Sequence, residues 1–335
     1  MPIASPLIHP PLVDIVGVGL NALDTIIRLP QFPAFNSKME ILSSNSYPGG
    51  QVASALVACQ RWGLRTRYIG KIGDDFAGRV HREEFAREEV EAHLIEVPHC
   101  ESQLSYILVE RSSGERTVLW KRDARLDISP AELRPEWIER ARLLHVDGHP
   151  TAPAIAAARM ARQAGISVMA DLDNLYEGVE VLLEHIDYLI SSREFPERVT
   201  GIPDLMQAIL EIKRRFGCKI VGATLGIDGA LAWDGHAFHY SPAFRVDAVD
   251  TTGAGDIFHA AFAYALLKGT TLKDILDFSC AAAALNCTGA GARGGIRPLK
   301  EIHEVMNLGS RHASIFNATE LSERSASARH MKSKT

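Results

Sequence analysis

The residues best suited to chemistry form a short stretch at 250–256, which reads Asp-Thr-Thr-Gly-Ala-Gly-Asp and runs into an apolar segment. Glycines lack a Cβ, so consecutive backbone N–H groups can face a ligand, and a helix that begins here points its unpaired N–H groups at the same place. Such a cradle favours a phosphate group. Asp256 falls in the first helical turn, within reach of a hydroxyl group that approaches this phosphate. The stretch predicts phosphoryl transfer to an alcohol, with Asp256 as the general base. The donors of the cradle would be the N–H groups of Gly253, Ala254 and Gly255.

A tight turn before a capped helix would give a similar local pattern, so the meaning of the stretch depends on the whole string. The string resembles the second signature of the ribokinase-like carbohydrate kinases, the PfkB family, which reads Asp-Thr-x-Gly-Ala-Gly-Asp, and every signature position matches. The sequence contains no Walker-type phosphate loop, and no Gly-x-Gly-x-x-Gly follows the first predicted strand. The resemblance covers residues 12–305 and implies an ATP-dependent kinase that phosphorylates a primary hydroxyl group of a sugar or sugar derivative.

A second group of residues resembles the first signature of the same kinases and would bind the acceptor. It comprises Gly49, Gly50 and Gln51, at the start of a helix predicted over 52–62, and a glycine-rich stretch at 68–78. Paired glycines allow the backbone to approach a sugar closely, although a simple helix entry would also use them. Ser54 stands where the family usually has Asn, so the resemblance supplies no sugar contact at that position.

Asp24 is a further candidate for acceptor binding. It follows the first predicted strand, at the position where the family resemblance implies a carboxylate that accepts hydrogen bonds from sugar hydroxyl groups. A carboxylate only accepts hydrogen bonds and therefore suits vicinal hydroxyls, and open α/β sheets bind ligands at the carboxyl ends of their strands. The alternative is a solvated surface carboxylate.

The nucleotide would lie along a turn that ends another predicted strand. Thr224, Gly226 and Gly229 resemble the Thr-x-Gly-x-x-Gly turn of the family, and a β-turn between two strands would fit the same residues. The resemblance also places Ser192 and Gly291 beside the cofactor. Ser192 stands where relatives commonly have the Asn of an Asn-x-x-Glu motif, and Phe195 stands at the Glu position, so this motif is altered here. Glu194 lies one position away.

Two kinds of metal ion are implied by the resemblance. Asp250 and Thr252 lie where many relatives bind a monovalent cation such as K⁺, with further oxygen ligands from the loop at 287–295. Hard cations prefer such oxygen ligands. Mg²⁺ is expected with ATP, because phosphoryl transfer needs the charge on the β- and γ-phosphates to be neutralised.

The elements that must position these residues follow an α/β pattern. Short apolar runs rich in β-branched residues predict strands, and they are mostly separated by helical patterns such as 154–163 and 205–216. The predicted strands lie at 12–19, 143–146, 166–170, 188–190, 220–224 and 231–233. This alternation predicts a mostly parallel sheet covered by helices on both faces, a three-layer α/β/α sandwich.

Two segments interrupt the alternation, at 24–47 and 102–121. The second holds apolar runs at 106–109 and 117–120 with a turn at Ser113 and Gly114, which predicts a hairpin in a separate small antiparallel sheet. The resemblance identifies this sheet as the family's β lid, which closes over the sugar. Because a sheet of a few strands cannot bury both faces alone, we expect a homodimer joined through the lids.

Basic residues are dense around the predicted lid. Lys38, Lys121, Arg122 and Arg125 are solvated surface charges in the simplest interpretation. The alternative hypothesis is that Lys38 and Arg122 bind an anionic group of the acceptor, such as a carboxylate, phosphate or sulfonate.

The length allows one large domain, which the resemblance implies is a kinase domain over 12–308, and the few large apolar residues at 309–335 predict a flexible tail. A formal charge of −5 argues against nucleic acid as a partner. No apolar run is long enough for a membrane span, and residues 1–11 lack the features of a signal peptide, so a cytoplasmic protein is expected. The 5 cysteines form no Cys-x-x-Cys pair and predict neither disulfides nor structural zinc. Two other functions fit the same fold, a nucleoside kinase and a non-catalytic regulator that binds sugar or nucleotide.

Overall fold

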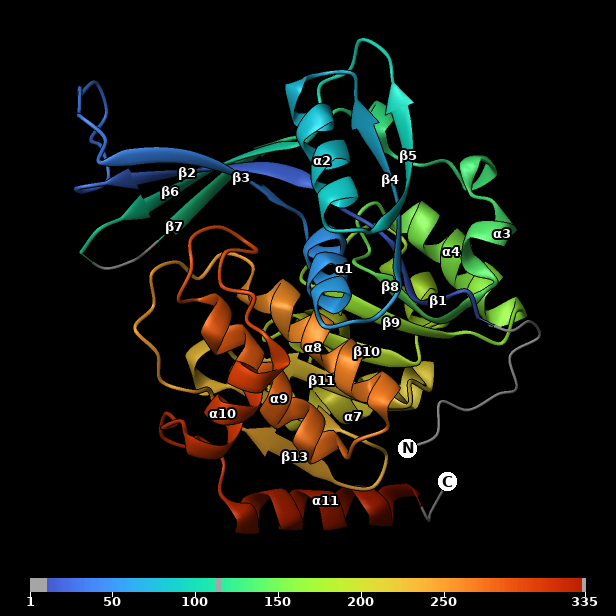
Figure 1. Ribbon diagram of the computed structural model, residues 1–335. Helices are drawn as coiled ribbons and strands as arrows, with labels where there is room; N and C mark the ends of the chain where they lie inside the picture. Colours follow the sequence, from blue (N-terminus) through green and yellow to red (C-terminus); the bar gives the residue numbers. More distant parts are fainter. Residues whose placement is uncertain (1–10, 113–115, 333–335) are drawn as a thin grey trace.

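The computed structural model describes residues 11–112 and 116–332, with side chains described as far as Arg329. The interpretation of the first ten residues and the predicted turn at Ser113 and Gly114 lie outside the described residues. The chain forms a large central sheet covered by helices on both faces, and a smaller sheet projects from one side (Figure 1). This arrangement confirms the predicted three-layer α/β/α sandwich with an additional small sheet.

In the described residues the central sheet has nine strands, of which only β12 is reversed: it pairs antiparallel with both β11 and β13, and every other neighbouring pair is parallel. Every strand predicted for it from the sequence is present. Three further strands, β4, β5 and β13, were not predicted, and β4 overlaps the glycine-rich stretch at 68–78. From one edge to the other the strands are β13 (Phe238–Ser241), β12 (Ala230–Trp233), β11 (Ile220–Thr224), β10 (Tyr188–Ser192), β9 (Ser167–Leu172), β8 (Ala141–Val146), β1 (Val13–Val18), β4 (Thr66–Gly73) and β5 (Glu91–Val97).

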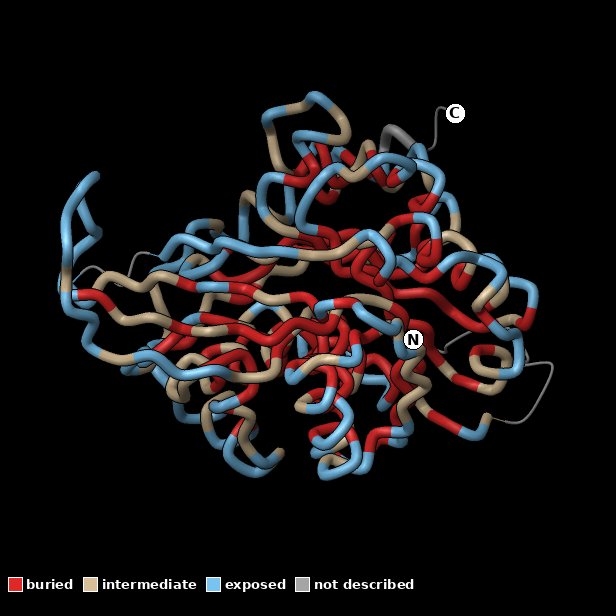
Figure 2. The backbone as a smooth tube through the Cα atoms, turned by 90° about the horizontal axis from the view of Figure 1, so that it is seen from above, coloured by how far each residue is buried: buried red, intermediate tan, exposed pale blue. Residues whose placement is uncertain are grey.

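The helices pack against the two faces of this sheet through two separate apolar clusters. One cluster joins the sheet to α1 (Gln51–Arg61), α8 (Ala254–Lys268), α9 (Leu272–Asn286) and α10 (Leu299–Leu308). The other joins it to α3 (Pro135–Ile138), α4 (Thr151–Gln163), α5 (Val179–Leu183), α6 (Phe195–Thr200) and α7 (Leu205–Phe216). Helix α2 (Phe76–Arg87) lies against β4 and β5. Figure 2 shows the buried residues concentrated in the middle of the molecule.

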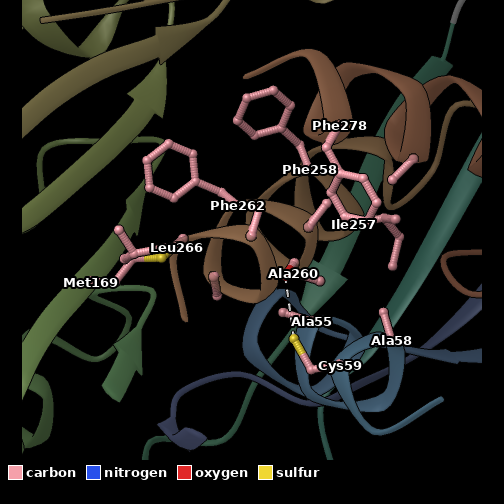
Figure 3. Packing of buried hydrophobic residues seen from close by; sticks show 14 of the residues in the cluster. Ala55, Ala58, Cys59, Met169, Ile257, Phe258, Ala260, Phe262, Leu266 and Phe278 are labelled. Carbon is pink, nitrogen blue, oxygen red and sulfur yellow. Dashed lines mark hydrogen bonds between the residues drawn. The ribbon is translucent and has the colours of Figure 1, made fainter. Parts of the chain in front are cut away.

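Helices α1 and α8 approach each other closely, which matters because both begin at the candidate site. Small side chains on α1, such as Ala55 and Ala58, face α8 at Ala260 (Figure 3). The Cys59 thiol also donates a hydrogen bond to the Ala260 carbonyl oxygen at 3.3 Å. A dense apolar interface resists shear, so the first turns of both helices are held in fixed relation.

The small sheet has the strand order β3-β2-β6-β7, and it is formed by the segments that the sequence predicts as a lid, so we call it the lid. Its strands are β2 (Ala22–Leu29), β3 (Ser43–Gly49), β6 (Leu104–Glu110) and β7 (Arg116–Lys121). The pairs β2–β3 and β6–β7 are antiparallel, as expected. The pair β2–β6 is parallel, because the chain passes through α1, β4, α2 and β5 between these strands.

The end of the chain contains a helix where the composition indicates a flexible tail. Helix α11 (Ala318–Lys332) lies beside β13, the edge strand of the large sheet (Figure 1). The Ser325 hydroxyl accepts a hydrogen bond from the Phe238 amide at 2.9 Å, and Ala328 is buried. Small residues and an ion pair between Arg324 and Asp204 hold this helix against the domain. The low content of large apolar residues therefore did not indicate a flexible segment here.

No helix in the described part of the chain is long and apolar enough to cross a membrane.

Candidate active site

The 250–256 stretch forms the entry to α8, as its glycines indicate. Gly253 precedes the helix with a φ of 74°, and a Cβ at this position would overlap the carbonyl oxygen of Ala292. The side of Gly255 where a Cβ would stand is open space. Ile257 donates its backbone N–H to the Gly253 carbonyl at 2.9 Å, whereas the geometry of a first helical turn leaves the amides of Gly255 and Asp256 without an intrahelical acceptor. Of the predicted donors, Ala254 already donates to the Thr251 carbonyl oxygen at 3.3 Å, so the free amides are those of Gly255 and Asp256. This entry can therefore hold an anion.

Asp256 is the third residue of α8 and is half-buried. Burial raises the pKa of Asp256, while the nearby His259 and the Arg293 guanidinium act in the opposite direction. A carboxylate with a raised pKa accepts a proton more readily than an exposed one, so the environment suits a general base.

Asp24 reaches the same region from strand β2 of the lid, and its side chain is 7% exposed. Burial, and to a smaller extent the neighbouring Asp256 carboxylate, raise the pKa of Asp24 to about 7, while a hydrogen bond with Ser105 acts in the opposite direction. A Cβ on Gly49 would overlap the Asp24 carboxylate, which explains why glycine is needed at that position. Gly50 follows with a φ of 94° and caps α1, and the Gln51 side chain hydrogen bonds to Asp171. The structure thus brings Asp24, Gly49, Gly50 and Gln51 together.

Arg293 fixes this corner of the site from the loop between α9 and α10, and sequence reasoning missed it. Its side chain is 5% exposed and donates to the Ser54 hydroxyl at 3.1 Å, to the Gly49 carbonyl at 2.9 Å and to the Glu84 carboxylate. Ser54 therefore contacts Arg293 rather than pointing to the surface. An arginine in a glycine-rich loop offers no sequence signal that separates such a role from a solvated charge.

Three of the five residues predicted to bind the nucleotide line a cleft of about 370 Å³ beside the entry to α8, whereas Ser192 and Gly291 are not among the described residues that line it. These three are Thr224, Gly226 and Gly229, and the cleft reaches Gly255. The rest of the lining is mostly apolar and includes Phe244, Val246, Ala248, Phe258, Cys280, Ala283, Ala284, Cys287 and His312. Apolar walls with a few polar groups are typical of sites that bind a planar base.

The C-terminal segment contributes to this cleft, which sequence reasoning also missed. Arg311 stacks on the Phe244 ring at 3.9 Å from its centroid and pairs with Asp277 at 2.9 Å. The His312 amide donates to the Ala243 carbonyl at 2.9 Å. These contacts hold the Phe244 wall of the cleft in place.

The altered Asn-x-x-Glu region lies at the end of β10. The Ser192 hydroxyl donates to the Asp173 carbonyl oxygen at 3.1 Å, and Ser192 is not among the described residues that line the cleft. Phe195 is buried in the apolar core, whereas Glu194 is exposed at the start of α6.

Asp250, Thr252 and Gly291 lie together, as the sequence interpretation requires. The Asp250 carboxylate accepts hydrogen bonds from the amides of Thr252 at 2.9 Å and Gly291 at 2.8 Å. The carbonyl oxygens of Thr252 and Ala292 both accept from the Asn286 side chain, at 3.3 and 3.1 Å. Among the described residues no group of three or more His, Cys, Asp or Glu side chains is placed to hold a metal ion.

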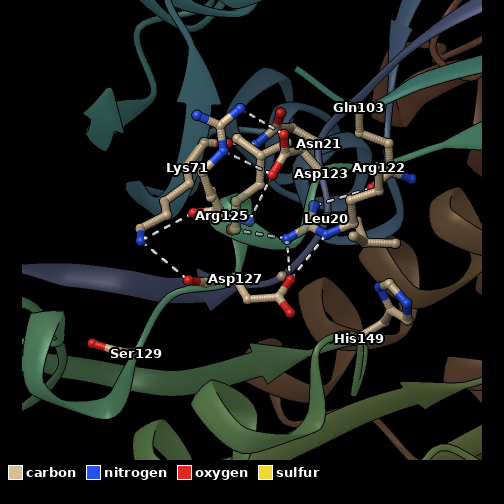
Figure 4. Close-up of polar contacts among 12 residues, drawn as sticks. Leu20, Asn21, Lys71, Gln103, Arg122, Asp123, Arg125, Asp127, Ser129 and His149 are labelled. Atoms are coloured by element: carbon tan, nitrogen blue, oxygen red, sulfur yellow. Dashed lines mark hydrogen bonds and ion pairs between the residues drawn. The ribbon is translucent and has the colours of Figure 1, made fainter. Parts of the chain in front are cut away.

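The basic residues near the lid contact protein groups (Figure 4). Arg122 donates to the Asp127 carboxylate at 3.1 Å, to Gln103 at 3.0 Å and to the Leu126 carbonyl at 2.9 Å. Lys121 pairs with Glu101, and Arg125 pairs with Asp123 at 2.7 Å. Lys38 is exposed in the loop between β2 and β3.

Further polar and aromatic residues surround the acceptor side and were not singled out from the sequence. Asp147 directly follows β8, accepts from the Leu20 amide at 2.6 Å and has a pKa that burial raises to about 7. The ring of His149 lies between Trp120 and Tyr176, with centroid distances of 6.0 and 4.7 Å. A polar residue directly after a predicted buried strand is a signal that could have identified Asp147.

Comparisons with known proteins agree with this geometry. A family model described as pfkB family carbohydrate kinase matches residues 14–298. A ribokinase of Bacillus subtilis is 27% identical over 88% of this chain and 99% of its own length. A nucleoside kinase of Methanothermobacter thermautotrophicus is 26% identical over 81% of this chain and 88% of its own length.

A solved structure shows the same fold. The Arabidopsis thaliana ribokinase, crystallised with ribose and ATP, superimposes with a TM-score of 0.76 at 23% identity, over 88% of this chain and 99% of that one. The family match includes the small sheet and the predicted residues of the candidate site, and it ends before α10 and α11.

Proposed function

This chain belongs to the pfkB family of carbohydrate kinases and is a phosphotransferase with an alcohol group as acceptor; we propose that it transfers the γ-phosphate of ATP to a primary hydroxyl group of a neutral sugar or sugar derivative. The proposal depends on one observation: the open helix entry at Gly255, the Asp256 carboxylate and the end of the cleft lie next to one another.

In the proposed reaction Asp256 accepts the proton of the acceptor hydroxyl group. The hydroxyl oxygen forms a bond to the γ-phosphorus, and the bond from that phosphorus to the bridging oxygen breaks, which releases ADP. The amides at the entry to α8 would hold the negative charge on the transferred phosphate. The lid would exclude water, which limits ATP hydrolysis.

The acceptor would lie between the lid and the carboxyl ends of the central strands. Asp24 and the backbone at Gly49 and Gly50 would bind its hydroxyl groups, because carboxylates accept hydrogen bonds from vicinal hydroxyls. A neutral acceptor is favoured because Arg122 already contacts Asp127, Gln103 and Leu126, and Lys121 already pairs with Glu101. The anionic alternative predicts that Arg122→Ala weakens kcat/KM for a charged acceptor much more than for its neutral analogue.

A nucleoside is the second candidate acceptor. The aromatic rings of Trp120, His149 and Tyr176 lie on the acceptor side, and the Trp120 side chain is 61% exposed. Such rings can stack on a base. Phe32 and Phe35 lie in the exposed loop between β2 and β3 and Tyr106 is exposed on β6, so these three residues offer less support.

ATP would occupy the cleft with its base against the apolar wall near Phe244 and its phosphates towards Gly255. Mg²⁺ would neutralise phosphate charge and be held mainly by the nucleotide and water, since Glu194 is exposed and Phe195 is in the core. A monovalent cation such as K⁺ stays a prediction for Asp250 and Thr252. Each Asp250 carboxylate oxygen accepts one amide hydrogen bond and retains a lone pair.

We also propose that two copies of the chain pair through their lids. Three consecutive residues of β7 expose large apolar side chains, namely Val118, Leu119 and Trp120. An exposed apolar strand at the edge of a small sheet is a surface that a second copy can cover.

The experiment that tests the function measures ADP release with ATP and Mg²⁺ across a panel of sugars, sugar acids, sugar phosphates and nucleosides. We expect turnover with at least one neutral sugar and a loss of about 10²- to 10⁴-fold in kcat for Asp256→Asn, the usual scale of general-base catalysis. ATP affinity should change little. A folded Asp256→Asn variant with nearly normal turnover would contradict the base assignment, and turnover with nucleosides alone would favour the second candidate.

A further inference from the structure

One buried pair of side chains directly beneath the helix entry has no part in the function proposed so far. His259 lies one turn after Gly255 on α8 and is 2% exposed. Asp171 lies on β9 and is 5% exposed. The His259 Nδ1 atom is 3.2 Å from the Asp171 Oδ2 atom.

The polar groups that face the two nitrogen atoms of the His259 ring are all hydrogen-bond acceptors. Nδ1 faces the Gly255 carbonyl oxygen at 2.8 Å as well as the Asp171 carboxylate, and Nε2 faces the Ile190 carbonyl oxygen at 3.1 Å. Carbonyl oxygens cannot donate, so each ring nitrogen must carry a hydrogen to avoid a contact between two lone pairs. The ring is therefore an imidazolium, and Asp171 is its counter-ion.

Burial is the main effect that opposes the charged forms of His259 and Asp171. Burial raises the pKa of Asp171 and lowers the pKa of His259, so burial favours the neutral form of each group. The two side chains share one titratable proton, which can lie on the Asp171 carboxylate or on the second ring nitrogen of His259. The two carbonyl oxygens favour its position on the ring. A buried ion pair is maintained when its remaining hydrogen-bonding groups are satisfied.

The Gly255 carbonyl oxygen belongs to the same peptide group as the Asp256 amide. A hydrogen bond from a charged ring fixes the plane of this peptide group and polarises it, which makes the amide on its other side a stronger donor. That amide is one of the two unpaired donors at the helix entry. The positive ring also favours the ionised form of the Asp256 carboxylate.

We infer that Asp171 and His259 form a positioning pair, in which the protonated ring of His259 holds the peptide group between Gly255 and Asp256 and so orients the amide and the carboxylate that act on the transferred phosphate. The pair also connects both halves of the site, since Asp171 hydrogen bonds to Gln51 at the start of α1. The inference rests on the proposed roles of Asp256 and of the entry to α8.

Other charged groups also act on Asp256 and must be considered in any pH profile. They come from the lid, from the loop before α10 and from the strand ends, and comprise Arg116, Arg293, Asp24, Asp171 and Asp173. The His259 ring additionally faces the His145 ring on β8 at a centroid distance of 6.1 Å. In the described part of the chain the His145 ring nitrogens have no hydrogen-bond partner, so His145→Phe is a matched control for replacement of a buried ring.

The protonation state is tested by NMR on the full chain labelled with ¹⁵N-histidine, with His259→Phe used to assign the signals. We expect hydrogens on both His259 nitrogens at pH 7, and the loss of one of them in Asp171→Asn, which keeps the side-chain shape but removes the charge. A single N–H on His259 throughout pH 6 to 9 would overturn the inference. This measurement needs no turnover, so it stands apart from a failure of the proposed function.

The kinetic test compares His259→Phe and Asp171→Asn with His145→Phe. We expect kcat to fall by roughly 10- to 100-fold in the first two variants, less than the about 10²–10³-fold caused by removal of a direct oxyanion donor. The acid limb of the pH profile of kcat should move to higher pH, while KM for ATP and the kinetics of His145→Phe stay near the wild-type values. Normal kcat and an unshifted profile in folded Asp171→Asn would overturn the inference.

Discussion

Replacement of Arg293 by methionine removes the buried guanidinium that joins the loop before α10 to α1, α2 and the end of β3. The variant leaves the Glu84 carboxylate without its closest cation and the Gly49 carbonyl without its donor. Loss of one partner from a buried ion pair typically costs about 3–5 kcal/mol of unfolding free energy. Because Arg87 lies 3.6 Å from Glu84 and offers partial compensation, we expect about 3 kcal/mol, at the lower end of that range.

Urea unfolding measures this loss directly. With a denaturant dependence of about 3 kcal/mol per M, a loss of about 3 kcal/mol lowers the midpoint by about 1 M. The matched control is Arg214→Met, because Arg214 is 71% exposed in its pair with Glu211 and an exposed pair contributes only about 0–1 kcal/mol. The same Arg293 variant should raise KM for the acceptor by about 10-fold, equivalent to about 1.4 kcal/mol, since Gly49 loses its anchor. KM for ATP should change less.

The double variant Glu84→Leu with Arg293→Met separates folding from positioning. Removal of both charges should restore the unfolding free energy to within about 1 kcal/mol of the wild-type value. KM for the acceptor should stay raised, because the Gly49 carbonyl still lacks a donor. Recovery of both quantities would show that Arg293 acts only through stability. A loss below 1 kcal/mol in the single variant would refute the reasoning about the buried charge.

Three further predictions concern other parts of the molecule. Arg311→Ala removes the cation stacked on Phe244 and should raise KM for ATP by roughly 5- to 10-fold. The control Arg324→Ala, which loses only the pair with Asp204, should leave KM for ATP unchanged. Equal effects of the two variants in steady-state kinetics would exclude a role for Arg311 in the cleft. The pKa of Asp147 in the folded protein, about 7, lies above the usual 3.8, so its stabilisation is fully present below pH about 4 and is lost as the pH rises through about 7. Asp147→Asn should therefore reduce the decline in urea midpoint between pH 5 and pH 8, and an unchanged decline would count against this carboxyl group. Leu119→Glu places a charge on the exposed apolar strand of the lid and should shift a dimer to a monomer in light scattering, while a wild-type protein that is already monomeric at micromolar concentration would remove the lid dimer.

The sequence by itself determined those features that depend on short contiguous stretches. The alternation of apolar strands and helices predicted the layered sheet, because the period of a pattern depends on local geometry. The entry to α8 could also be predicted, since Gly253 and Gly255 act through their own backbone conformation. Asp24, Gly49 and Gly50 were predicted from the resemblance to the family, and their roles in binding the acceptor stay a prediction.

Only the tertiary structure decided which distant residues support these motifs. Arg293 reaches Gly49 across 244 positions of the chain, and His259 meets Asp171 and Ile190 only because α8 packs over β9 and β10. Arg311 and α11 belong to a segment whose composition indicates a flexible end, yet they contact the cleft wall and the edge strand β13. Such contacts depend on side-chain packing between elements far apart in the chain, and no local pattern of residues encodes them.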